Sequence, residues 1–240
     1  MAEDVEDEDD IRFYQWTPEN AVRPRDAASL VLIREGDKGP EILMGQRHPK
    51  HAFMPRVYVF PGGRIDPSDS RVRPATALKP EVAARLGRAT PSGRARAAAV
   101  AAVRETFEET GLMLAKPGPA QTESVAGAWQ GFFEKGMAPA LDELDALARA
   151  ITPAQSPIRF HARFFVAEVE HLSGEIGGSG ELENIAWIPV SEAMRMSLAD
   201  ITELVAAHAA EWFANRHAGR PSSPVPLYCY RHGERLVLRR

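Results

Sequence analysis

The sequence predicts a mixed α/β domain in which helices lie on both sides of a sheet. Segments with strand and helix patterns alternate along the 240 residues, and no internal repeat is visible. Hydrophobic residues make up 44% of the chain and charged residues 26%, close to the average of soluble globular proteins, so a core can form. We expect one domain at 13–240, preceded by an acidic tail at 1–12 that stays solvated.

Charge and cysteine content exclude several classes of protein. Seven of the 33 acidic residues lie in the first ten positions, which leaves 26 acidic against 29 basic residues and gives no case for a nucleic-acid partner. The single cysteine, Cys229, excludes an internal disulfide framework and a multi-cysteine zinc site. No apolar run reaches the ~18 residues of a membrane span, and the acidic start differs from a secretory signal. We therefore expect a cytoplasmic protein without a membrane partner.

The first third of the chain has the pattern of a β-hairpin followed by a glycine turn. Segments 27–34 and 41–47 are rich in apolar and β-branched residues, and turn residues separate them. A third short strand at 56–60 ends at a Pro-Gly-Gly sequence. The next segment, 66–93, contains several prolines and is expected to be irregular, with one short helix at 80–86.

A helix is predicted for 94–110, which is rich in alanine and lacks glycine and proline. It ends at Gly111, a residue type suited to a helix C-cap. Further helical structure is expected at 124–150, in particular at 140–150, where apolar residues recur at helical period. The remaining expected elements are a strand at 158–170, a loop at 173–180, a strand at 184–190, a helix start at 191, an amphipathic helix at 201–216 and a strand or hairpin at 224–238.

The predicted helix carries three carboxylates on one face. With about 100° per residue, Glu108 and Glu109 project within about 60° of Glu105, opposite an apolar stripe. Like charges at this spacing repel, and a divalent cation would reverse that repulsion. Oxygen ligands of this kind suit Mg²⁺ or Mn²⁺, whereas a plain solvated helix face is the alternative if the helix is taken alone. The stripe comprises Val100, Val103 and Phe107.

This helix and the glycine turn together resemble the box of the Nudix hydrolase family, G-x5-E-x7-R-E-U-x-E-E-x-G-U, where U is a bulky apolar residue. Asp69 stands at the first glutamate position and Thr106 at an apolar one. From Gly63 to Arg104 the chain spans 41 positions where the box needs 14, so about 27 residues are inserted as a loop at about 70–93, at a closure cost that grows slowly with length. The matching residues are Gly63, Arg104, Glu105, Glu108, Glu109, Gly111 and Leu112.

The resemblance implies an α/β/α sandwich with a mixed β-sheet between helices. It also implies hydrolysis of a diphosphate linked to another moiety, by metal-activated water. Glu105, Glu108 and Glu109 would be catalytic ligands of Mg²⁺ or Mn²⁺, and Arg104 would orient them. The general base would be Glu105 or a later glutamate. For the later one the candidates are Glu181 and Glu183, with an ordinary exposed loop pair as the alternative.

The substrate expected first is coenzyme A or an acyl-coenzyme A. The sequence Gly-Gly-Arg-Ile-Asp-Pro-Ser-Asp-Ser at 62–70 resembles the peroxisomal-type coenzyme A diphosphatases and their bacterial relatives, which carry an insertion inside the box. A coenzyme A signature of another Nudix branch matches at Leu43, Arg47 and 60–63 alone. ADP-ribose, NADH and a non-catalytic nucleotide sensor remain alternatives, as does a structural protein with an incidental acidic helix.

Four residues are candidates for substrate binding. Gly62 and Gly63 allow the backbone to approach a ligand closely, and the guanidinium groups of Arg47 and Arg56 suit phosphate oxygens. His48 and His51 have the spacing of metal ligands, but no third nitrogen or sulfur ligand is near them in the sequence. We expect a small nucleotide-linked diphosphate as the partner, and a homodimer is left open.

Overall fold

The computed structural model describes residues 22–50, 54–87, 90–119, 121, 127–218, 222–231 and 234–239. Its centre is a mixed sheet with strand order β10-β2-β1-β8-β7-β11-β12, in which β3 pairs with β2 and β4 with β1. The expected tail at 1–12 and His51 lie outside the described residues. The strands of this sheet are β1 (Arg25–Gly36), β2 (Gly39–Arg47), β3 (Tyr58–Val59), β4 (Gly62–Arg64), β7 (Asp145–Ile151), β8 (Phe160–Glu168), β10 (Leu182–Pro189), β11 (Leu227–Arg231) and β12 (Glu234–Leu238).

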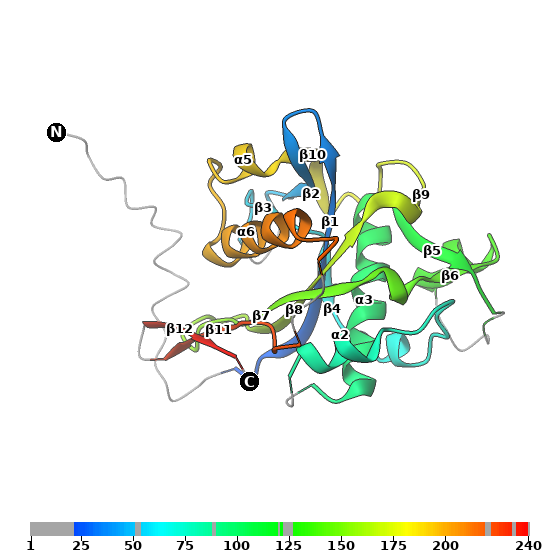
Figure 1. Ribbon diagram of the computed structural model, residues 1–240, viewed down its shortest axis with the longest axis horizontal. Helices are drawn as coiled ribbons and strands as arrows, with labels where there is room; N and C mark the ends of the chain where they lie inside the picture. The colour runs from blue at the N-terminus through cyan, green and yellow to red at the C-terminus, as the bar shows by residue number, and fades with distance from the viewer. Residues whose placement is uncertain are drawn as a thin grey trace.

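Helices cover both faces of the sheet, as the sequence predicts (Figure 1). On one face lie α2 (Pro80–Arg85), α3 (Ser92–Thr110) and α4 (Gln130–Phe133), beside a small sheet of β5 (Met113–Pro117), β6 (Met137–Pro139) and β9 (Leu172–Ser173). On the other face lie α5 (Val190–Ala193) and α6 (Asp200–Ala214). In the part of the chain that the structure describes, no helix is both long and apolar enough to span a bilayer.

The hairpin of β1 and β2 is confirmed, with Ile33 opposite Ile42 in antiparallel register. β1 lies in the centre of the sheet, between β2 and β8. It pairs with β8 in parallel along nine residues, from Arg25 beside Phe160 to Ile33 beside Glu168. Leu30, Val31, Leu32 and Ile33 of β1 are fully buried, since their side chains alternate between the two helical layers. The terminal hairpin of β11 and β12 and the helix α6 are confirmed as well.

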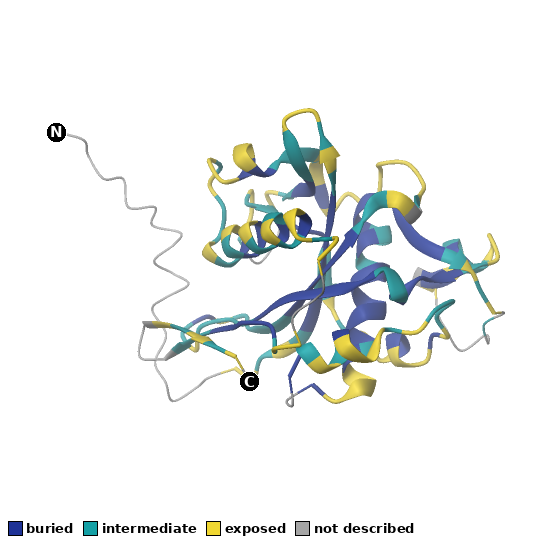
Figure 2. Ribbon diagram, viewed as in Figure 1, coloured by how far each residue is buried: buried dark blue, intermediate teal, exposed yellow. Residues whose placement is uncertain are grey.

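Helix α3 is surrounded by protein along most of its length (Figure 2). Its alanines let it approach β1 closely, and Val100 and Val103 lie in the core. The third residue of the predicted stripe, Phe107, is half-buried and packs edge-on against Phe132 at 4.9 Å between ring centroids. Gly111 ends the helix in the left-handed conformation, with φ 76°, and its N–H donates to the carbonyl of Phe107.

The prediction of helix over 140–150 is wrong. Residues 141–143 form one 3₁₀ turn, and Asp145–Ile151 is strand β7, which lies between β8 and β11. The first five residues of β7 are buried, so both faces of the strand are covered and its sequence lacks the alternation of a half-exposed strand. The small residues of this segment pack on both sides, and tertiary pairing overrides their helical preference. Elsewhere in 124–150, the described helix is limited to the four residues of α4 and a 3₁₀ turn at Gly127–Trp129.

The segment inserted between the two halves of the box is packed rather than looped out. It contains the predicted short helix, α2, and its side chains Val72, Val82 and Leu86 are buried in the core beside α3. A guanidinium hydrogen bond from Arg96 to the carbonyl of Val72, at 2.9 Å, holds the start of the segment against α3. The insertion therefore contributes to the hydrophobic core.

Candidate active site

The last turns of α3 meet the glycine turn that begins β4. The N–H of Gly62 donates to Oε2 of Glu109 at 2.8 Å. A Cβ on Gly63 would lie 2.5 Å from Oε1 of Glu105, and a Cβ on Gly62 would lie 2.6 Å from the carbonyl oxygen of Ala28. Such distances are too short for a side chain, so only glycine lets this backbone approach the carboxylates.

Arg104 connects the two halves of the box. Its Nε and Nη2 donate to the two carboxylate oxygens of Asp69 at 2.9 and 3.1 Å, although 35 positions separate the residues. Its Nη1 donates to Glu105 at 2.8 Å and to Glu108 at 3.0 Å, and Nη2 also reaches the carbonyl of Arg64 at 2.9 Å. Burial lowers the pKa of Arg104, but the hydrogen bonds to Asp69 and the nearby carboxylates outweigh that effect and raise it. Arg104 is thus a permanent cation that orients the acidic residues.

A loop that follows β9 places a further carboxylate, that of Glu181, near these groups. The N–H of Gly177 donates to the carbonyl of Thr110 at 2.8 Å, and the N–H of Ser179 donates to that of Glu108 at 2.7 Å. These contacts supply partners for the last carbonyls of α3, which have none within the helix. Gly178, at φ 113°, has no room for a side chain, because a Cβ there would lie 2.2 Å from the carbonyl oxygen of Glu109. The loop ends near Glu181, whose side chain lines the pocket described next.

The glycine turn, helix α3 and the loop after β9, together with residues of β2, β3, β8 and β10, enclose a pocket of about 250 Å³. Three carboxylates line the pocket, those of Glu105 and Glu109 from α3 and that of Glu181, and Arg47 of β2 is the cation beside them. The complete lining is Arg47, Val59, Gly62, Gly63, Arg64, Glu105, Glu109, Phe160, Glu181 and Leu182.

Burial shifts the pKa values of the two inner glutamates upward. It raises the pKa of Glu105 to about 7, although the charge of Arg104 opposes the shift. It raises the pKa of Glu109 to about 8, against the hydrogen bond from Gly62. Burial also lowers the pKa of Arg47, while the charge of Glu109 acts in the opposite direction. Burial thus favours the protonated form of both acids, whereas a bound cation would favour their charged form.

The oxygen chemistry of this pocket fits a divalent cation. Glu105, Glu109 and Glu181 line one cavity, their negative charges oppose one another, and hard carboxylate oxygens suit Mg²⁺ or Mn²⁺. Glu108 faces Arg104 instead and does not line the pocket. Among the described residues, no three His, Cys, Asp or Glu side chains form a ready-made metal cluster. The assignment of Glu105, Glu108 and Glu109 as metal ligands therefore stays a prediction.

The structure brings together most of the residues that the sequence singles out, but not all. Arg47, Gly62, Gly63, Glu105 and Glu109 line one pocket, and Asp69 occupies the position expected for the first glutamate of the box, against Arg104. Arg56 does not line the pocket: it is exposed, its φ is 61°, and its N–H donates to the carbonyl of Arg47.

Glu183 lies outside the pocket too, 3.5 Å from His48. Its neighbour Glu181 lies inside, which favours Glu181 over Glu183 as the later carboxylate. The sequence interpretation missed Val59, Arg64, Phe160 and Leu182. Arg64 directly follows the two glycines and could have been noticed for that reason. Phe160 reaches the pocket because β8 pairs with β1, and nothing in the sequence around it indicates a binding residue.

Comparison with known proteins agrees with this geometry. The model of the NUDIX domain matches residues 23–213. A solved structure of a NUDIX hydrolase from Alicyclobacillus acidocaldarius is 28% identical, with a TM-score of 0.59, and the match covers 80% of this chain and 96% of that one.

Two curated proteins are similar in sequence. "Putative nudix hydrolase 7" of Caenorhabditis elegans is 28% identical over 180 residues, 71% of this chain and 53% of that protein. "Acyl-coenzyme A diphosphatase NUDT19" of Gallus gallus is 32% identical over 125 residues, 39% of this chain and 33% of that protein. The matches thus span about half of one relative and a third of the other. Because the domain model covers most of the chain, including the glycine turn, the acidic helix and all strands of the main sheet except β11 and β12, the chain belongs to the Nudix family.

Proposed function

We propose that this protein hydrolyses the diphosphate linkage of a nucleoside-diphosphate-linked compound with the help of Mg²⁺ or Mn²⁺. The observation that carries the proposal is the pocket in which the Gly62–Gly63 backbone meets the buried carboxylates of Glu105 and Glu109. A diphosphate needs cationic and backbone N–H partners, and a metal needs carboxylates. The pocket offers both kinds of group within one small volume.

Each group has a role that its position supports. Arg47 would bind phosphate oxygens, and Gly63 would let the diphosphate approach the backbone. Glu105 and Glu109 would hold the cation inside the pocket, and Glu108 would complete the set from beside Arg104, whose guanidinium group orients the carboxylates of Glu105 and Glu108. When bound, the metal supplies charge neutralisation on the bridging oxygens and a lowered pKa for the attacking water.

Hydrolysis needs one proton acceptor in this pocket. The water oxygen forms a bond to phosphorus, the bridging P–O bond breaks, and a carboxylate takes the water proton. Glu105 and Glu181 are the candidates, since both line the pocket. Glu105 is largely buried beside Arg104, whereas Glu181 is exposed on the segment that leads into β10.

Coenzyme A or an acyl-coenzyme A is the substrate that we propose first. Two observations support it: the sequence at 62–70 resembles that branch of the family, and a relative of 32% identity is named an acyl-coenzyme A diphosphatase. Cleavage of the diphosphate in coenzyme A would give adenosine 3′,5′-bisphosphate and 4′-phosphopantetheine.

The test is a substrate panel with Mg²⁺ or Mn²⁺. It contains coenzyme A, acetyl-coenzyme A, ADP-ribose, NADH and dinucleoside polyphosphates, and chromatography identifies the products. We expect fastest turnover of coenzyme A or its acyl ester. Faster turnover of ADP-ribose or NADH would contradict the proposed substrate but would still support the proposed hydrolysis of a diphosphate. Nucleotide binding without any cleavage would instead identify a sensor, and would overturn the proposed hydrolysis.

A further inference from the structure

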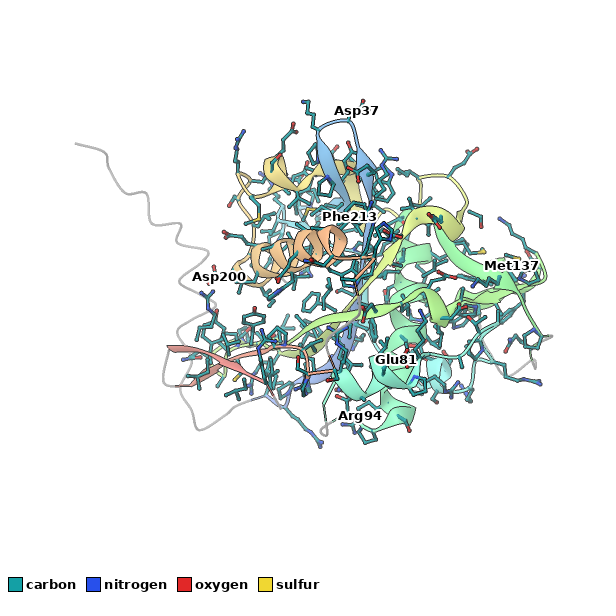
Figure 3. The ribbon with its side chains drawn as sticks, in the orientation of Figure 1. Asp37, Glu81, Arg94, Met137, Asp200 and Phe213 are labelled. Carbon is teal, nitrogen blue, oxygen red and sulfur yellow. The ribbon has the colours of Figure 1, made fainter. Side chains whose placement is uncertain are left out.

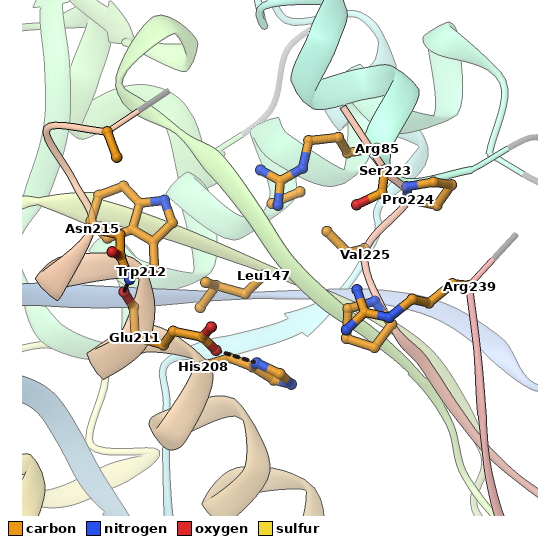
Figure 4. Close-up of a pocket in the computed structure, with 13 residues that line it drawn as sticks. Arg85, Leu147, His208, Glu211, Trp212, Asn215, Ser223, Pro224, Val225 and Arg239 are labelled. Atoms are coloured by element: carbon orange, nitrogen blue, oxygen red, sulfur yellow. Dashed lines mark hydrogen bonds and ion pairs between the residues drawn. The ribbon is translucent and has the colours of Figure 1, made fainter. Parts of the chain in front are cut away.

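A second cavity, of about 300 Å³, lies away from the glutamate pocket and shares no lining residue with it. Figure 4 shows side chains from several elements converging on this cavity. The end of α2 contributes Arg85, β7 contributes Leu147, and one face of α6 contributes His208 and Trp212. The segment before β11 and the end of the chain complete it with Val225 and Arg239. The hydrolysis proposed above gives no role to this cavity.

The cavity has an apolar floor with a fixed aromatic ring. Leu147 and Val225 are 5% and 1% exposed, so their side chains form a rigid surface. The indole Nε1 of Trp212 donates to Oδ2 of Asp145 at 2.8 Å, which fixes the orientation of the ring. A flat apolar group can pack on such a surface.

The walls of the cavity carry two guanidinium groups. Arg85 is held by an ion pair with Asp145, and its Nε is buried without a hydrogen-bond partner. Arg239 is exposed and has neither an ion pair nor a hydrogen bond within the described part of the chain. The carboxylate that lines the cavity, Glu211, is 74% exposed and lies 3.8 Å from His208. Among the described residues, Arg239 therefore has no ion-pair partner, and it lies beside the apolar residues of the cavity.

We propose that this cavity is a binding site for a small organic anion, whose carboxylate or phosphate pairs with Arg239 and whose flat apolar part packs on Trp212 and Leu147. A guanidinium group binds either anion through paired N–H donors, and the volume is at the lower end of known ligand sites. Because Arg85 belongs to the segment inserted within the Nudix box, the insertion forms one wall of this site.

Titrations monitored by ¹H–¹⁵N NMR test the proposal without reference to turnover. The probes are phenyl phosphate, benzoate and the uncharged benzyl alcohol. The chain has four tryptophans, so the indole signal of Trp212 can be assigned from the spectrum of Trp212→Phe. We expect at least one of the two anions to shift this signal saturably, and benzyl alcohol to bind much more weakly. The tighter of the two anions identifies the anionic group.

Variants at two exposed arginines provide the matched comparison. Arg239→Gln should weaken binding of the preferred anion about fivefold to tenfold, the loss expected for one charge-assisted contact. Arg235→Gln removes an equal charge from β12, where the side chain lies 3.8 Å from Asp200 and outside the cavity lining, and should bind like the unmodified protein. The proposal is overturned if neither anion shifts the Trp212 signal, if benzyl alcohol binds equally well, or if Arg239→Gln leaves the affinity unchanged.

Discussion

Arg104 holds both carboxylate oxygens of Asp69, at 2.9 and 3.1 Å, and thereby ties helix α3 to the 3₁₀ turn at Pro67–Ser70. Asp69 is fully buried, and its Oδ2 also accepts the N–H of Asp66 at 2.8 Å. Both halves of the box therefore depend on this ion pair, although the inserted segment separates them in sequence.

Replacement of Asp69 should destabilise the protein strongly. Asp69→Asn removes the negative charge opposite a buried guanidinium group, and breaking a buried pair in this way costs about 3 kcal/mol or more. Urea denaturation measures the free energy of unfolding. Asp37→Asn is the control, because Asp37 is exposed at the tip of the β1–β2 hairpin (Figure 3) and should change stability little. Equal stabilities of the two variants would contradict the structural role of Asp69.

Glu109→Gln should abolish most turnover while the fold persists. The amide keeps the shape of the side chain, and loss of a buried charge does not disfavour folding because burial already raises the pKa of Glu109 to about 8. We expect kcat to fall by a factor of ~100 or more. Glu175→Gln, at an exposed loop position, is the control. A Glu109→Gln variant with nearly full activity would remove this residue from the proposed metal site.

Gly63→Ala should impair catalysis more than stability. The added Cβ would lie 2.5 Å from the Glu105 carboxylate, which must move away, and displacement of a catalytic group by about 1 Å can cost ~100-fold in rate. Thermal unfolding and kcat should be measured together. Gly93→Ala is a matched control, since nothing lies within 4 Å of its Cβ position in the first turn of α3. If both variants kept full activity, the close approach at Gly63 would have no catalytic importance.

The parts of the structure that the sequence predicts well are those with local signals. The helix ending at Gly111 and the β1–β2 hairpin follow from composition, capping and turn residues. Strand β7 does not, because its alanines satisfy a helical period equally well and its burial on both faces depends on distant strands. The same limit applies to the site: the box residues form two short runs with recognisable spacing, at 62–69 and 104–112, whereas Phe160 reaches the pocket from a strand placed by pairing with β1 and β7.

Stability should also depend on pH through His161 of β8, which is not among the residues that line the glutamate pocket. Burial lowers the pKa of His161 to about 4; the charges of Arg163, Arg149 and Arg94 act in the same direction, and Asp26 opposes them. The folded protein therefore keeps this imidazole neutral at a pH where the unfolded chain, with an ordinary pKa near ~6.5, already binds a proton. The contribution is fully present above pH ~6.5 and is lost as the pH falls toward 4, by about 2 to 3 kcal/mol.

The comparison with His161→Gln isolates this effect from the carboxylates, which titrate in both proteins. Urea denaturation at pH 7 and pH 4.5 gives the change in unfolding free energy for each. The variant cannot be protonated, so its stability should decrease less between the two pH values than that of the unmodified protein, whatever its stability at pH 7. The His161 side chain is 17% exposed, and its Nε2 is buried without a hydrogen-bond partner among the described residues. Water therefore solvates the protonated imidazole poorly in the folded state. An identical pH dependence in both proteins would mean that His161 titrates normally in the folded state.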